Sequence, residues 1–172
     1  MPAGDVIDVF DRVQVPEKLA DHLRTVELVD HHVHGVFNEP VDRAGFEESI
    51  NEGSTDPIPG FMTQFDSPLG LSLRRWCAPL LGLDAFADAD TYWKRRAELT
   101  PGELADVFLP PARVARWVVD TGFKGDLIST PQRLTELSGA PSSEILRLER
   151  LAEDLLEAGT AAEAFPDAFR AA

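Results

Sequence analysis

Hydrophobic positions along the chain follow two spacings. Residues 26–29 and 116–121 are short, largely apolar runs, the first followed by a polar motif and Gly35 and the second directly by Gly122, and this pattern predicts strands. The second run is nearly continuous, as a buried parallel strand requires. Elsewhere the apolar residues recur three or four positions apart, between prolines, glycines and residues that cap helices. The pattern predicts an α/β protein that is strongly helical.

The boundaries between these patterns divide a single expected domain, residues 1–172, into four segments. They are leading helices in residues 1–25, the first strand in 26–35, a long helical insertion in 36–113, and the second strand with its following helices in 114–172. In the last segment, Ser142 is expected to cap a helix that runs to Ala158. The sequence stops within an unfinished helical pattern, so we expect a longer natural protein.

The first predicted strand ends in the most informative motif of the chain, Asp30-x-His32-x-His34. Successive side chains of a strand point to opposite faces, so these three residues share one face. Imidazole is the commonest protein ligand of zinc and similar metals. The motif therefore predicts that His32 and His34 bind a divalent metal, with zinc as the first candidate, and that Asp30 orients a ligand. The alternative is a pair of hydrogen-bonded histidines at a strand-to-loop junction.

At this motif the chain resembles the amidohydrolase superfamily of metal-dependent hydrolases. The version Asp-His-His-Val-His-Gly-Val at residues 30–36, followed by Asp-Arg-Ala-Gly-Phe-Glu at 42–47, is most similar to the branch related to uronate isomerase and to the amidohydrolase domain fused to glutamine synthetase. Weaker likeness continues through residues 74–81, 118–122 and 138–141. The resemblance implies a (β/α)8 TIM barrel in which metal-activated water attacks a carbonyl-type carbon of a small-molecule substrate. Because the branch includes an isomerase, isomerisation stays open beside hydrolysis.

Chain length limits how much of such a barrel can be present. A (β/α)8 barrel takes about 250 residues, whereas this chain has 172. We therefore expect only the N-terminal part of a TIM barrel. The later ligands of the family, two further histidines and an aspartate, and its general base have no match in this sequence. The isolated chain is accordingly expected to be inactive.

The helical insertion follows the carboxyl end of the first strand, the side on which barrel enzymes place their active sites. It is therefore expected to form a lid or a substrate cap. Arg74 and Arg75 within it could bind an anionic substrate, although most helical arginines only pair with surface acids. Asp120, near the tip of the second strand, could bind substrate or a ligand histidine, or could equally cap the turn that follows.

Composition and charge argue against some classes of binding partner. A formal net charge of −14 argues against nucleic acid and anionic membranes. The run Lys94-Arg95-Arg96 is interpreted as a solvated helix face over the edge of a core. There is no secretory signal and no apolar window long enough to cross a membrane, and one cysteine, Cys77, fits a reducing cytoplasm.

Two other classes of function stay open beside the hydrolase. In the first, the chain is half of a barrel that is completed by a second polypeptide, as a homo-oligomer or with a separate C-terminal chain. In the second, it is a non-catalytic remnant that only binds metal or a protein partner. Two imidazoles alone make a weak site, because catalytic zinc usually has three protein ligands.

Overall fold

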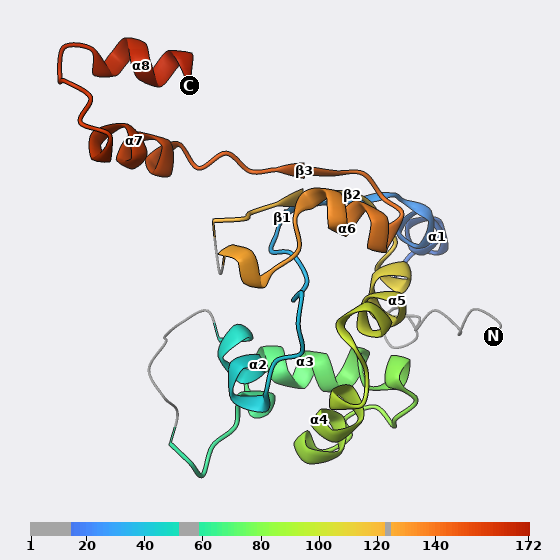
Figure 1. The fold of residues 1–172 in the computed structure, drawn as a ribbon. Coiled ribbons are helices and arrows are strands. Elements are labelled where there is room, and N and C mark those ends of the chain that lie inside the picture. The colour runs from blue at the N-terminus through green and yellow to red at the C-terminus, as the bar shows by residue number, and fades with distance from the viewer. Residues whose placement is uncertain (1–14, 52–58, 123–124) are drawn as a thin grey trace.

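A small parallel sheet organises the chain. The computed structural model describes residues 15–51, 59–122 and 125–172. The strands are β1 (Leu28–Val33), β2 (Val114–Val119) and β3 (Ser142–Glu144), in the order β1-β2-β3 (Figure 1). The central strand β2 buries Trp117 and Val119, whereas the edge strand β1 leaves Val29 58% exposed. The nearly continuous apolar run of β2 therefore matches its position between two neighbours.

Helices surround and extend this sheet. They are α1 (Glu17–Thr25), α2 (Arg43–Ser49), α3 (Pro68–Trp76), α4 (Ala89–Ala97), α5 (Pro101–Ala112), α6 (Pro131–Ser138), α7 (Leu148–Glu157) and α8 (Phe165–Ala171), with 3₁₀ turns η1 (Gln64–Asp66), η2 (Pro79–Leu81) and η3 (Gly125–Leu127). In Figure 1, α2, α3 and α4 form a layer separate from the sheet, and α7 and α8 extend away from the rest. The described residues contain no helix both long and apolar enough to cross a membrane. The first of the leading helices predicted in residues 1–25 lies outside the described residues.

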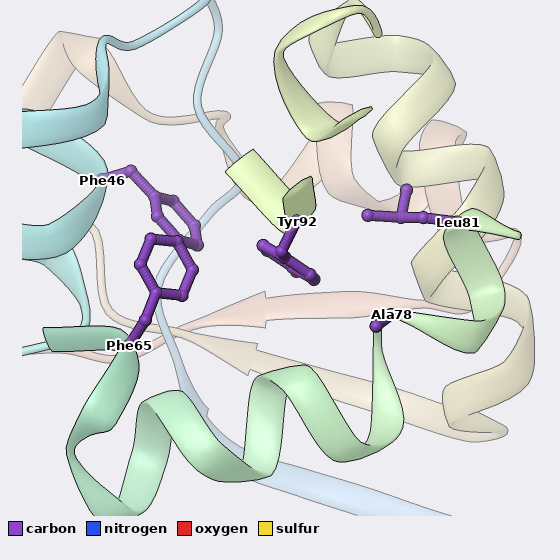
Figure 2. Packing of buried hydrophobic residues seen from close by; sticks show 5 residues of the cluster. All are labelled: Phe46, Phe65, Ala78, Leu81 and Tyr92. Atoms are coloured by element: carbon purple, nitrogen blue, oxygen red, sulfur yellow. The ribbon is translucent and has the colours of Figure 1, made fainter. Parts of the chain in front are cut away.

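Two hydrophobic cores hold the described chain together. The core of the helical layer consists of Phe46, Phe65, Ala78, Leu81 and Tyr92, which come from α2, η1, η2, α4 and the turn after α3 (Figure 2). Its aromatic rings meet at centroid distances of 5.5 to 5.7 Å, in the range of favourable aromatic pairs. The second core packs Trp117 and Val119 of β2 against Leu134 of α6. The helical layer therefore has a hydrophobic core independent of the sheet.

The predicted fold, the N-terminal part of a (β/α)8 TIM barrel, is wrong, because the described residues do not show barrel architecture. The described residues form an open sheet of three strands, and both β1 and β3 lie at its edges. A barrel closes only when enough strands accumulate tilt and twist to bring the first strand beside the last, and eight do so in a TIM barrel. Three strands, one of them only three residues long, do not provide that curvature.

The helix predicted from Ser142 to Ala158 is also wrong at its beginning. Ser142 starts β3, which pairs in parallel with β2, and the helix α7 begins only at Leu148. The backbone N–H of Trp117 donates to the carbonyl of Pro141, and that of Ile145 donates to Val119. Pairing with the central strand therefore outweighs the helix-capping preference of serine.

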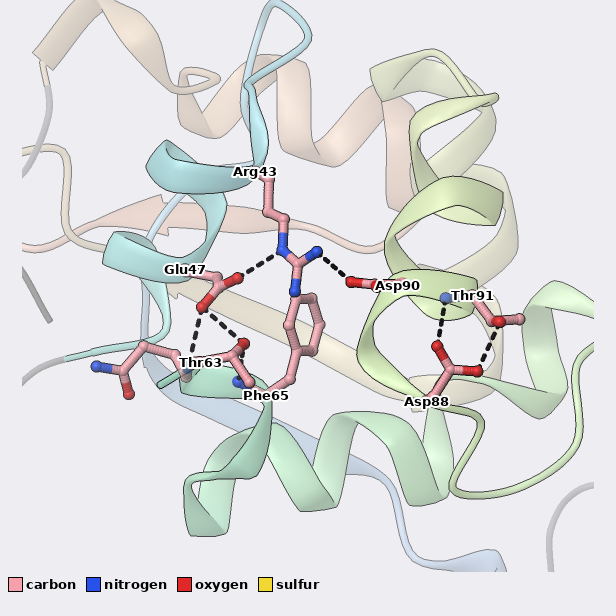
Figure 3. A network of polar contacts seen from close by, with 8 residues as sticks. Arg43, Glu47, Thr63, Phe65, Asp88, Asp90 and Thr91 are labelled. Carbon is pink, nitrogen blue, oxygen red and sulfur yellow. Dashed lines mark hydrogen bonds and ion pairs between the residues drawn. The ribbon is translucent and has the colours of Figure 1, made fainter. Parts of the chain in front are cut away.

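A half-buried carboxylate, that of Glu47, connects the parts of the helical layer (Figure 3). Glu47 of α2 accepts hydrogen bonds from Arg43 Nε at 2.7 Å, Thr63 Oγ1 at 2.8 Å and the backbone N–H of Gln64 at 2.7 Å. Arg43 also pairs with Asp90 of α4. Burial by itself raises the pKa of Glu47, but these hydrogen bonds outweigh it and hold the pKa below its usual range. Glu47 therefore connects α2, η1 and, through Arg43, α4.

Replacing Glu47 by Gln should lower the free energy of unfolding by about 1–3 kcal/mol, because partly buried donors lose a charged acceptor. Since the folded pKa is depressed, the wild-type advantage should be complete above the unfolded pKa of about 4.3 and disappear as the pH falls through the folded value. Urea unfolding at several pH values measures both effects. Glu136→Gln, which removes an exposed i,i+3 pair with Arg133, is the control. Equal losses in the two variants would contradict this role of Glu47.

Candidate metal centre

The candidate metal centre lies where β1 and β2 end side by side. The two strands are parallel, so their carboxyl ends meet at one edge of the sheet. The backbone N–H of Asp120, directly after β2, donates to the carbonyl of Val33 at 2.8 Å. This hydrogen bond places Asp120 beside His34, 86 positions earlier in the chain.

Three potential metal ligands converge there. His32 Nε2 lies 3.3 Å from Asp120 Oδ2, and the imidazole rings of His32 and His34 have their centroids 5.6 Å apart. One ligand atom from each of these three residues lies within 4.8 Å of the others. Asp120 is only 2% exposed, His34 is half-buried and His32 is exposed. The cluster is therefore anchored on its aspartate side and accessible on its His32 side.

A backbone contact favours one tautomer of His34. Its Nδ1 lies 3.2 Å from the backbone carbonyl oxygen of Asp120. A carbonyl oxygen can only accept, so Nδ1 must carry the proton in this hydrogen bond and the lone pair of the neutral ring then resides on Nε2. Metal-binding histidines commonly donate their second ring N–H to a backbone carbonyl in this way, which fixes both the tautomer and the ring orientation.

Arg147 and Gly122 hold the Asp120 carboxylate in place. Arg147 donates from Nε to Oδ1 at 2.8 Å and from a terminal nitrogen to Oδ2 at 2.5 Å, and the backbone N–H of Gly122 donates to Oδ1 at 2.9 Å. The Arg147 hydrogen bonds, opposed by burial and assisted by Gly122, lower the pKa of Asp120 to about 2. Asp120 is therefore ionised at neutral pH, as a metal ligand must be.

The side chains of His32, His34 and Asp120 are of the types that bind a divalent cation. A carboxylate offers about four acceptor positions, and Arg147 and Gly122 use three of them, two on Oδ1 and one on Oδ2. The remaining position is on Oδ2, the oxygen nearest His32. Two imidazoles and one carboxylate form a three-ligand set of the kind found in catalytic zinc and non-haem iron sites.

The sequence predicted two alternative contacts for Asp120, one with a ligand histidine and one with the turn that follows, and the structure shows both. Its carboxylate lies beside the imidazole of a predicted ligand, His32, and it also accepts the backbone N–H of Gly122 in the following turn. The other predicted acid, Asp30, contacts backbone: its Oδ1 accepts the N–H of His32 at 3.3 Å. Within the described residues, the carboxylate at an imidazole of the cluster is therefore Asp120 and not Asp30.

The structure does not bring Arg74 and Arg75 to this cluster. Both lie on α3 in the helical layer, where Arg74 pairs with Asp66 at 2.9 Å. The Arg75 guanidinium lies over the rings of Trp76 at 4.6 Å and Phe86 at 5.7 Å. In the described part of the chain, both side chains thus have local partners.

Sequence reasoning missed Arg147. The predicted helix from Ser142 placed it on a helix, whereas it follows the extended β3 and precedes α7. No local signal links it to Asp120, 27 positions earlier. The space for its side chain depends on Gly122, because a Cβ added there would lie 2.5 Å from Arg147 Nε.

Gly35 fixes the direction of the chain after His34. A Cβ at this position would lie 2.3 Å from the backbone carbonyl oxygen of Ser129, a contact that real Cβ atoms do not make. Ser129 and Val36 exchange hydrogen bonds, Ser129 N–H to the Val36 carbonyl at 2.7 Å and Val36 N–H to Ser129 Oγ at 3.2 Å. The glycine therefore permits a close backbone approach directly beside the cluster.

Comparisons with known proteins give a likeness at the level of fold. No family model matches the chain, and no curated protein matches it. Among solved structures, it is similar to the crystal structure of a putative metal-dependent hydrolase from Lactobacillus casei ATCC 334, with 23% sequence identity and a TM-score of 0.52. The alignment covers 88% of this chain but only 39% of that protein. At this level of identity, the likeness shows a shared fold.

Replacing Gly35 by Ala should lower the free energy of unfolding by about 1–3 kcal/mol, since the new methyl group meets backbone that cannot rotate away. Gly102→Ala is the matched control, because nothing lies within 4 Å of its Cβ position in α5. That change should be neutral or stabilise the protein by roughly 0.5–1 kcal/mol. Urea unfolding of the two variants provides the comparison. Similar stabilities would show that Gly35 does not need its missing side chain.

Proposed function

We propose that His32, His34 and Asp120 bind a divalent cation, with zinc as the first candidate, and that the chain contributes this centre to a metal-dependent hydrolase. The observation that carries the proposal is the convergence of the three ligand atoms within 4.8 Å at the ends of two parallel strands. The carboxyl edge of a parallel sheet is where α/β proteins generally place their functional groups.

Neighbouring groups hold the three candidate ligands in position. The Asp120 carbonyl holds the ring of His34, and Arg147 keeps the Asp120 carboxylate ionised and oriented. A bound divalent cation would polarise a carbonyl-type group and lower the pKa of a coordinated water. Because His32 is exposed, the cluster is open to solvent on the side from which water and substrate would approach.

Two likenesses support the hydrolytic part of the proposal. The motif of residues 30–36 resembles that of the amidohydrolase superfamily, and the solved structure of similar fold is itself named a "putative metal-dependent hydrolase". The proposed reaction is attack of activated water on a carbonyl-type carbon of a small molecule.

Metal binding tests the proposed ligands directly. The wild-type chain should bind one equivalent of Zn²⁺ in isothermal titration calorimetry. His32→Ala and His34→Ala should each weaken binding by more than the roughly 10–100-fold that follows loss of a hydrogen-bond partner of a ligand. His31→Ala is the control, because His31 is exposed on the same strand and lies outside the cluster. Equal affinities of all three variants would overturn the ligand assignment.

Hydrolysis is tested on the protein purified from its own cells. A panel of esters, amides and lactones should reveal an activity that a chelator abolishes and added Zn²⁺ restores, because the cation supplies the activated water. The His31→Ala variant should retain this activity and the His32→Ala variant should lose it. Zinc binding at the three residues together with a chelator-insensitive activity would separate the metal centre from hydrolysis and overturn the second part of the proposal.

A further inference from the structure

A pocket of about 200 Å³ begins at Gly35, one residue after His34. Its wall on the sheet side is the segment 35–41, and its other walls come from α4, α5 and the turn between them. The lining is mainly apolar and includes Trp93, Leu104 and Phe108. An engineered cavity of roughly 150 Å³ is large enough to bind benzene, so this pocket has room for a small aromatic or branched aliphatic group.

Arg96 contributes a positive charge to this apolar lining. Its guanidinium carbon lies 4.4 Å from the ring centroid of Phe46 and 5.7 Å from that of Phe108. Sequence reasoning had interpreted Arg96 as part of a solvated face. Burial instead lowers the pKa of Arg96, although a side-chain hydrogen bond with Tyr92, its polar partner in place of a carboxylate, opposes this. A guanidinium removed from water needs a compensating partner.

The ion pairs among the described residues leave Arg96 without a carboxylate. Its neighbour Arg95 pairs with Glu98 at 2.9 Å, and Arg43 pairs with both Glu47 and Asp90. The acidic residue that lines the same pocket is Glu39, which is exposed and forms no ion pair with Arg96. The two aromatic rings compensate part of the desolvation but do not neutralise the charge.

We propose that this pocket binds the apolar body of a small carboxylate and that Arg96 pairs with the carboxylate group. A planar guanidinium is the side chain best suited to paired hydrogen bonds with a carboxylate. The inference rests on the proposed function for one point, that the bound molecule is the hydrolase substrate, whose scissile bond then lies toward His34. The substrate class is thus an apolar acid that carries a hydrolysable carbonyl group.

Benzoate and benzamide test the pocket, because they have nearly the same shape and differ in charge. Both are titrated into metal-free protein in the presence of a chelator, so the result does not depend on the metal centre. Benzoate should bind at least about tenfold more tightly than benzamide, as expected for a charge-assisted hydrogen bond. In NMR spectra, benzoate should shift the amide resonances of Gly35, Ala97 and Ala105, which line the pocket.

Variants separate anion recognition from packing. Arg96→Gln should reduce benzoate affinity about tenfold, the loss of one charge-assisted contact, and leave benzamide affinity unchanged. Arg95→Gln should change neither. If Arg96→Gln does not fold, the comparison of benzoate with benzamide on the wild-type protein, and Arg96→Lys, which keeps the charge, still decide the question. Equal binding of the two ligands, absence of binding, or benzoate shifts away from the pocket would each overturn the inference while leaving the zinc titration intact.

Discussion

The parallel pairing of β1 with β2 is the constraint on which the candidate site depends. The two strands are separated in sequence by the whole helical layer, yet the hydrogen bond from Asp120 N–H to the Val33 carbonyl aligns their ends. The same alignment brings the Asp120 carbonyl to His34 and the Asp120 carboxylate to His32. Asp120 therefore hydrogen-bonds to the backbone of β1 and also contacts the imidazoles of His32 and His34. Any change that shifts the strand register also separates these candidate ligands.

The sequence was informative where a short motif determines local geometry. Asp30 and His32 lie on β1 and His34 follows its end, so one short segment positions all three, and the apolar run of β2 follows from its central position in the sheet. In contrast, the partners of these residues depend on contacts between distant segments. Arg147 reaches Asp120 because residues 142–144 pair as a strand, although their serines favour a helix cap in isolation. Capping preferences are weak and tertiary pairing overrides them.

The barrel prediction failed for a related reason. The motif at residues 30–36 describes how one strand ends, whereas closure of a barrel depends on the number, tilt and stagger of all strands. A resemblance carried by one motif transfers the first property and not the second. The open sheet nevertheless retains what the motif requires, a parallel neighbour whose carboxyl end lies beside its own. The local chemistry of a site and the global topology of a fold are thus determined at different levels of the chain.

The helical layer has its own hydrophobic core, and the pocket lies at the edge of this layer. Because Phe46, Phe65 and Tyr92 pack among themselves, the layer does not need the sheet to fill its interior. The space between segment 35–41 and helices α4 and α5 is a pocket, and lining residues such as Trp93 and Phe108 also pack against the core of the layer. The Arg96 guanidinium lies over the rings of Phe46 and Phe108 and hydrogen-bonds Tyr92, and it lines the pocket without a carboxylate partner among the described residues. An apolar pocket whose one arginine lacks a carboxylate partner among the described residues therefore begins directly after the segment that carries the candidate metal ligands His32 and His34.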